Sequence, residues 1–282
     1  MAHMTFVEIE EAAREGSIVL FPVGVIEQHG PHLPLAVDVY GAYLQSLMVK
    51  SELEKKNINA LIAPPFYWGI NSATGAFAGS FTCKEETVVS VLFDALSCLK
   101  EWGFGPVLFI NHHMDGKHLQ AVDKAIRKAR KEIGIQVFWL MDQFFAGRIG
   151  FDVKEEHLLF FKTLMPFDPM PLHPDIHAES YETSFMWHYL PHLVKFEIWK
   201  TLKGTNLTVE DLQVWRKGGM KARKMTPQGY FGNPAAANPE RGRREMEDYG
   251  KTVADLIESF LRGSYAPPSP TATAKRIIKQ GG

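Results

Sequence analysis

Two apolar runs, Ser17-Ile-Val-Leu-Phe-Pro-Val23 and Ala60-Leu-Ile-Ala-Pro64, flank a helix-like segment at residues 39–53. Continuous apolar runs of this length are typical of strands buried inside a sheet, and the second run ends at prolines that cannot continue a strand. A strand, a helix and a second strand in this order predict a parallel or mixed sheet covered by helices.

The same alternation continues along the chain. We expect strands at 106–110 and 135–140, a Gly-rich loop at 67–82, and helices at 85–102, 117–131, 178–190 and 243–261. Because no internal repeat or linker divides the chain, we expect one domain over 4–263. The segment 264–282 is rich in Pro, Ser, Thr and Ala and is interpreted as a mobile or partner-docked tail. Met1-Ala2-His3 is expected to lie outside this domain.

The composition of the chain limits the classes of binding partner. The 282 residues carry 31 Lys and Arg against 32 Asp and Glu, a net charge of −1, which argues against a nucleic-acid partner and favours a small-molecule ligand. The apolar runs are far shorter than the ~20 residues that cross a bilayer, so no membrane association is expected. Two cysteines, Cys83 and Cys98, are too few for a disulfide scaffold and favour the cytoplasm.

Chemistry-bearing residues follow the first strand. The loop contains Glu27, His29, His32 and Asp38, residue types that suit zinc, manganese or iron, and open α/β proteins place their sites where strands end. Glu27 and His29 are two apart, so in extended backbone both side chains point to one side. The alternative is a polar surface loop with capping residues.

Two later segments repeat this pattern. His112, His113 and Asp115 follow the strand at 106–110, where Asp115 is either a ligand or the cap of the next helix. His177 and Glu182 are five apart, so either both face a site or one merely caps a helix.

The three segments, in this order, resemble the creatininase family of metal-dependent amidohydrolases over about 17–242. The family motif E-x-H-G-x-H-L-P-x-x-x-D is matched from Glu27 to Asp38. The second motif, N-G-H, is matched at Asn111 and His113, with His112 replacing the glycine. The third, H-A-G-E-x-E-T-S, is matched at His177, Ala178, Glu182, Thr183 and Ser184, while Glu179 and Ser180 depart from it.

The resemblance implies a three-layer α/β/α sandwich with a mostly parallel central sheet, a homohexamer, and two divalent metal ions per subunit, zinc first and manganese or iron as alternatives. Asp38 would bridge the ions, Glu27 and His113 would complete one site, and His29 with an acid the other. That acid is Asp115 or Glu182, and we favour Asp115 because a carboxylate already stands at the matching position. We further expect His177 to be a proton shuttle, and His32 and His112 to support the metal ligands or bind the substrate.

Such a site would hydrolyse a cyclic amide or another non-peptide C–N bond, because two cations lower the pKa of a shared water and polarise a carbonyl. The alternatives are a lactone or cyclic ketone as substrate, or a non-catalytic, metal-stabilised binding protein. The signatures of P-loop, Rossmann, nucleophile-elbow and H-E-x-x-H enzymes are absent. The aromatic residues Phe66, Tyr67, Trp68, Trp139 and Phe144 are interpreted as core or as a wall against a flat substrate.

Overall fold

A computed structural model describes residues 1–143, 145–146, 150–152, 154–162 and 171–267. Its centre is a five-stranded sheet in the order β2-β1-β3-β4-β5, and each neighbouring pair is parallel. The strands are β1 (Ile18–Val23), β2 (Ala60–Ile62), β3 (Val107–Asn111), β4 (Val137–Asp142) and β5 (Leu158–Phe161). This arrangement confirms the predicted α/β class with a parallel sheet.

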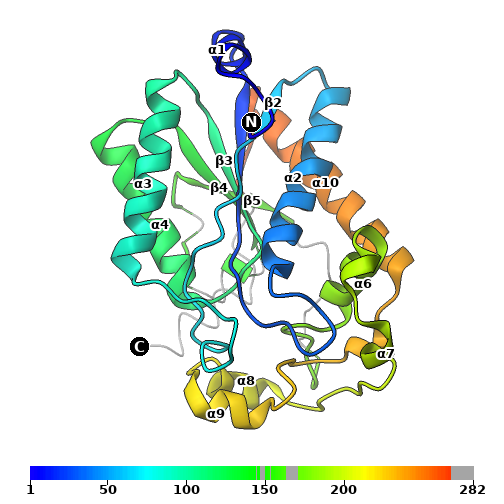
Figure 1. The fold of residues 1–282 in the computed structure, drawn as a ribbon. Helices are drawn as coiled ribbons and strands as arrows, with labels where there is room; N and C mark the ends of the chain where they lie inside the picture. Colours follow the sequence, from blue (N-terminus) through cyan, green and yellow to red (C-terminus); the bar gives the residue numbers. More distant parts are fainter. Residues whose placement is uncertain (144, 147–149, 153, 163–170, 268–282) are drawn as a thin grey trace.

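Helices cover both faces of the sheet (Figure 1). The helices α3 (Glu85–Glu101) and α4 (Gly116–Glu132) pack on one face, and α2 (Val37–Lys55) and α10 (Pro239–Leu261) pack on the other. Side chains alternate along each strand, so Phe109 joins the core under α3 and α4 while Leu108 joins the opposite core. Both faces are therefore buried, which explains the continuous apolar strands.

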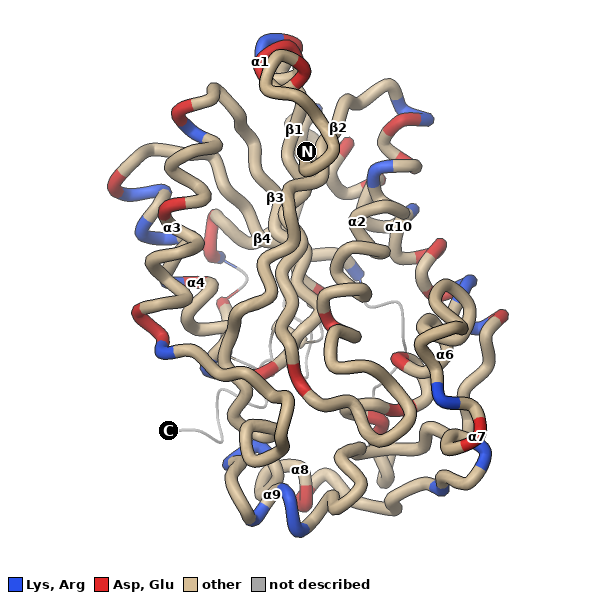
Figure 2. Tube along the Cα trace, in the orientation of Figure 1, with Lys and Arg blue, Asp and Glu red and all other residues tan. Residues whose placement is uncertain are grey.

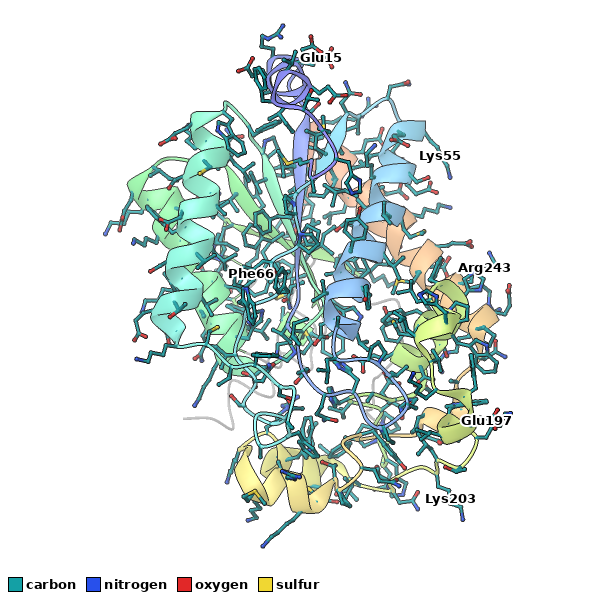
Figure 3. The ribbon with its side chains drawn as sticks, viewed as in Figure 1. Glu15, Lys55, Phe66, Glu197, Lys203 and Arg243 are labelled. Carbon is teal, nitrogen blue, oxygen red and sulfur yellow. The ribbon has the colours of Figure 1, made fainter. Side chains whose placement is uncertain are left out.

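The side-chain distribution follows these layers (Figure 3). Phe66 points inward beside the sheet, whereas charged side chains project outward at Glu15, Lys55, Glu197, Lys203 and Arg243. None of the helices in the described ranges combines the length and apolarity that crossing a bilayer requires.

Smaller elements gather beyond the carboxyl ends of the strands (Figure 1). They are α6 (Ser180–Tyr189), α7 (Phe196–Trp199), α8 (Val209–Trp215), α9 (Gly219–Met225) and the 3₁₀ turns Pro191–Leu193 and Pro234–Ala236. The loops that leave β1 and β3 run into this region, so their polar residues meet there.

Sequence reasoning missed α1 (Phe6–Arg14), β5, α7, α8 and α9. Both α1 and α8 begin with a capping box, at Thr5 with Glu8 and at Thr208 with Asp211, a local signal that marks where a helix begins but not how far it continues. Most of the predicted tail lies outside the described residues. Within the described part, the Tyr265 hydroxyl accepts a hydrogen bond from the backbone N–H of Phe160 on β5 at 2.9 Å.

Candidate metal centre

Five segments deliver the predicted residues to one buried place. Glu27 and His29 lie on the loop after β1, Asp38 is in the first turn of α2, and His113 follows β3. Glu182 lies in the first turn of α6, which Glu179 caps by accepting hydrogen bonds from the N–H groups of Tyr181 and Glu182. His177 is held by an antiparallel bridge to Phe231.

One group of potential ligands consists of Glu27, Asp38 and His113. His113 Nδ1 lies 3.1 Å from Glu27 Oε1 and 3.3 Å from Asp38 Oδ2. All three side chains are buried.

A second group consists of His29, Asp38 and Glu182. His29 Nε2 lies 3.8 Å from Asp38 Oδ2 and 3.8 Å from Glu182 Oε1. His29 Nε2 and Asp38 Oδ2 are buried and have no hydrogen-bond partner. Because Asp38 Oδ2 faces both His29 and His113, this oxygen is the point that the two groups share.

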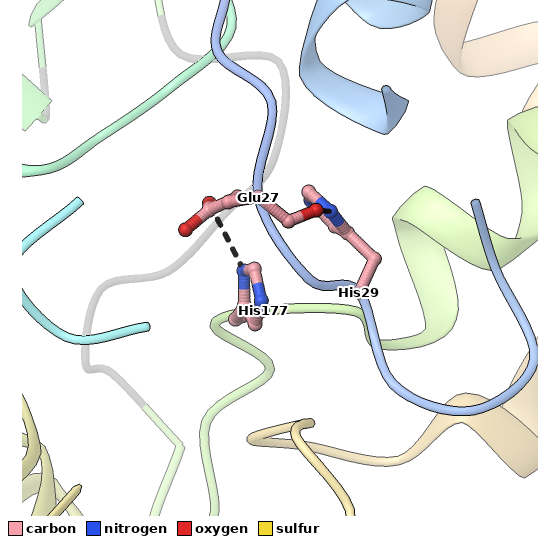
Figure 4. A group of neighbouring side chains, drawn as sticks. All are labelled: Glu27, His29 and His177. Carbon is pink, nitrogen blue, oxygen red and sulfur yellow. Dashed lines mark hydrogen bonds and ion pairs between the residues drawn. The ribbon is translucent and has the colours of Figure 1, made fainter. Parts of the chain in front are cut away.

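His177 lies against both groups. Its Nδ1 is 3.6 Å from Glu27 Oε1, and its ring centroid is 4.4 Å from that of His29. Figure 4 shows the Glu27 carboxylate turned toward His177, which comes from a separate segment of the chain, with His29 on the other side of the Glu27 backbone. These three residues form a third potential ligand group.

The three histidines share one hydrogen-bond arrangement. His29 Nδ1 is 3.0 Å from the carbonyl of Glu27, His113 Nε2 is 3.1 Å from the carbonyl of Ile70, and His177 Nε2 is 2.7 Å from the carbonyl of Gln28. Since a carbonyl only accepts, each of these nitrogens donates its proton. When the ring is neutral, as it must be to bind a metal ion, the other nitrogen of each ring presents its lone pair toward the carboxylates, as metal-binding histidines do.

The carboxylates and histidines of the cluster shift one another's pKa values. Burial alone would lower the pKa of His29, but Glu182, Asp38 and Glu27 raise it to about 9. Against the same effect of burial, Glu27 and Asp38 raise the pKa of His113 well above its ordinary value. Burial would raise the pKa of Asp38, yet His113 and His112 hold it low. In the described chain, the ion-pair partners of Glu27, Asp38 and Glu182 are all histidines rather than lysine or arginine.

Figure 2 shows acidic positions on the segments at the carboxyl end of the sheet, whereas positions of both charges lie on the outer helices. Buried carboxylates without fixed cations are costly unless protons or metal ions neutralise them.

The donor atoms fit metal ions. Two ligand atoms of a tetrahedral zinc ion, each about 2.1 Å from it, are about 3.4 Å apart. The separations of 3.1, 3.3 and 3.8 Å bracket this value. The unpartnered His29 Nε2 and Asp38 Oδ2 are what an ion would satisfy.

Asp115 lies apart from this cluster. Its carboxylate caps α4, accepting hydrogen bonds from the N–H groups of Lys117 and His118, and it also accepts one from the N–H of Ser72 at 2.8 Å. Of the two interpretations of Asp115, the structure therefore shows the helix cap. It brings Glu182 rather than the favoured Asp115 to His29 and Asp38, because the cap holds the Asp115 carboxylate at the start of α4.

His112 and His32 lie at the edge of the cluster. His112 Nδ1 is 3.1 Å from Asp38 Oδ1, and its ring stacks on Tyr181. His32 Nε2 is 2.9 Å from the Thr183 hydroxyl, and burial, with His29 and His177 nearby, lowers the pKa of His32 to about 4.

Sequence reasoning missed two supporting residues. The Thr74 hydroxyl donates a hydrogen bond to Glu27 Oε2. The side-chain amide of Gln28 donates to the carbonyl of Gly229 at 2.6 Å and also lies beside His177. Gln28 stands between two matched motif residues, a signal that could have been used, whereas nothing in the sequence marks Thr74.

Two of the aromatic residues proposed as a substrate wall, Phe66 and Trp139, belong to the core. Tyr67 and Trp68 are 42% and 41% exposed and pack on each other, and Trp68 also packs on Phe81. Phe144 lies outside the described residues.

The fold and the cluster together define an α/β protein with a buried carboxylate–histidine centre of the kind that holds metal ions. Residues 2–257 match the family model described as creatininase, creatinine amidohydrolase. The chain therefore belongs to the creatininase family.

Curated relatives carry several activities. Over 253 residues the chain is 26% identical to the "Mycofactocin precursor peptide peptidase" of Mycobacterium ulcerans, covering 88% of this chain and 86% of the relative. It is 23% identical over 285 residues to the "3-dehydro-scyllo-inosose hydrolase" of Thermotoga maritima, covering 94% and 85%. It is 29% identical over 146 residues to the "Creatinine amidohydrolase" of Pseudomonas putida, covering 49% and 54%.

Solved creatininase structures share the fold. A crystal structure of creatinine amidohydrolase superposes with a TM-score of 0.68 at 19% identity, covering 95% of this chain and 98% of the other. A structure titled "Creatininase Mn" gives a TM-score of 0.65 at 20% identity, covering 92% and 97%.

Proposed function

We propose that this protein is a dinuclear metal-dependent hydrolase that cleaves an amide C–N bond of a small molecule. The observation that carries the proposal is the shared orientation of His29, His113 and His177, each of which turns its second ring nitrogen toward buried carboxylates that no lysine or arginine neutralises in the described chain.

In this proposal Glu27, Asp38 and His113 hold one ion and His29, Asp38 and Glu182 hold the other. Zinc is the first choice, because mixed imidazole and carboxylate ligands suit it, with manganese or iron as alternatives. Such ions, when bound, lower the pKa of water and polarise a carbonyl. His112 holds Asp38 Oδ1, which leaves Asp38 Oδ2 turned to the centre.

His177 is our candidate proton shuttle. The Gln28 carbonyl fixes the proton on Nε2, so Nδ1 is the atom that takes a proton from the attacking water and returns it to the leaving nitrogen. The Glu27 carboxylate, 3.6 Å from Nδ1, stabilises the positive imidazole in between.

The test is hydrolysis of a panel of cyclic amides, short peptides and lactones by protein stripped with a chelator and reloaded with zinc or manganese. We expect turnover only after reloading. His177→Ala should lower kcat by about 10²- to 10⁴-fold while two ions per chain are retained. Absence of turnover on every panel member, despite two bound ions, would instead favour a metal-stabilised binding protein.

The panel also separates substrate classes. Relatives named as peptidases favour a peptide amide as the second candidate, because they match most of the chain. The relative named as an inosose hydrolase favours a carbonyl substrate other than an amide. The free cysteines Cys83 and Cys98 support a cytoplasmic location, and the family resemblance supports a homohexamer; native mass spectrometry tests the latter.

A further inference from the structure

Nδ1 of His177 can serve either as a metal ligand or as a proton relay. Its Nε2 is engaged by the Gln28 carbonyl at 2.7 Å, so Nδ1 carries the only free lone pair of the ring. That lone pair lies 3.6 Å from Glu27 Oε1, a separation that suits two ligands of one ion as well as a proton relay.

His29 also has only one ring nitrogen available to a metal ion. Its Nδ1 donates to the Glu27 carbonyl, and its Nε2 has no partner. The ligand atoms of Glu27, His29 and His177 all lie within 4.8 Å of one another, as do those of His29, Asp38 and Glu182. Because one nitrogen lone pair binds one ion, His29 cannot serve an ion in each of the two groups at the same time.

From this geometry we propose that the second ion has an alternative ligand set, Glu27, His29 and His177, which excludes the Asp38–Glu182 set and occupies the nitrogen that would move the proton. The inference rests on the dinuclear centre proposed above. In Figure 4 the Glu27 carboxylate and His177 face each other, and the Gln28 carbonyl already orients His177 for this contact.

The two sets differ in chemistry. The Asp38–Glu182 set offers two carboxylates and one imidazole, and the alternative set offers two imidazoles and one carboxylate. Carboxylates suit manganese and imidazoles suit zinc, so zinc should use the alternative set more readily than manganese. Charge favours the Asp38–Glu182 set, so the alternative set should fill when Glu182 is replaced by glutamine.

Metal stoichiometry tests the proposal without relying on activity. Chelator-stripped protein is reloaded with zinc or manganese, desalted, and its ions per chain are counted by elemental analysis and native mass spectrometry. We expect wild type to bind two zinc ions and Glu182→Gln to keep two, whereas Glu182→Gln combined with His177→Ala should bind one. With manganese, Glu182→Gln alone should bind one.

The matched control combines Glu182→Gln with His32→Ala, which removes another buried imidazole that belongs to neither set. This variant should keep two zinc ions. Circular dichroism checks folding, and His177→Gln replaces His177→Ala if that double variant does not fold. The proposal is overturned if Glu182→Gln binds only one zinc, or if the double variant lacking His177 still binds two. Wild type binding fewer than two zinc ions would instead overturn the dinuclear function.

Discussion

Asp115 ties the start of α4 to the loop between β2 and α3. Its Oδ1 accepts from the backbone of Lys117 and His118, and its Oδ2 accepts from the N–H of Ser72. Two of these bonds cap α4 and the third joins it to a distant loop, so this side chain stabilises the frame around the cluster.

Asp115→Ala should therefore bind two ions per chain and lose stability. Loss of a helix cap costs about 1 kcal/mol, and the N–H of Ser72 also loses its acceptor. Asp115→Asn keeps an oxygen acceptor and should lose less. Elemental analysis and thermal melting measure both effects. Loss of one ion from Asp115→Asn would show that Asp115 is a ligand after all.

The sequence alone predicted the motif residues of the site, but it did not decide which acid joins His29 and Asp38. Asp115 and Glu182 are both carboxylates in matched motifs, and spacing along the chain does not say which one reaches His29. That choice depends on a cap at α4 and on the Glu179 cap that begins α6, so it is a property of tertiary structure.

At the scale of elements, the irregular segment 63–84 between β2 and α3 supports the cluster. Thr74 donates to Glu27, and the Ile70 carbonyl accepts from His113 Nε2. Such contacts to metal ligands fix their orientation and tune their affinity. A Gly-rich segment that has no helix or strand thus contacts two of the three ligands of one proposed site directly.

Thr74→Val removes the hydroxyl while keeping the shape of the side chain. We expect the affinity for the ion at Glu27 and His113 to fall about 10- to 100-fold, measured by competition with a chromophoric chelator. Thr82→Val is the matched control, because Thr82 accepts from the N–H of Asn71 in the same segment but contacts no proposed ligand. Equal losses in both variants would mean that the effect is general loosening of the segment.

The sheet was predictable because its strands are continuous apolar runs and its long helices have strong periodicity. Four-residue β5 and the short helices α8 and α9 were not, since short elements depend on packing more than on local pattern. One of these short helices nevertheless contacts the site, because Trp215 of α8 packs beside the His177 ring at a centroid distance of 5.7 Å.

At the scale of the whole molecule, the segments that follow the carboxyl ends of the strands meet at the buried carboxylate–histidine cluster. The charge state of this cluster therefore affects the stability of the folded chain. In the metal-free protein, the neighbouring carboxylates raise the pKa of His29 from 6.5 to about 9 despite its burial. The protonated ring is then the positive charge that the carboxylates require.

The metal-free protein should therefore lose stability as pH rises from about 6.5 to about 9. In that range the unfolded chain has released the His29 proton and the folded chain keeps it, so the stabilising contribution is complete below the lower value and is lost through the upper one. A shift of this size corresponds to about 3 kcal/mol, and His113, whose pKa is also raised, acts in the same direction. Thermal melting at a series of pH values measures the slope. In metal-loaded protein the ions replace these protons, so the decline should vanish and binding should strengthen with pH. A parallel decline in both forms would mean that the cluster histidines do not exchange protons for metal.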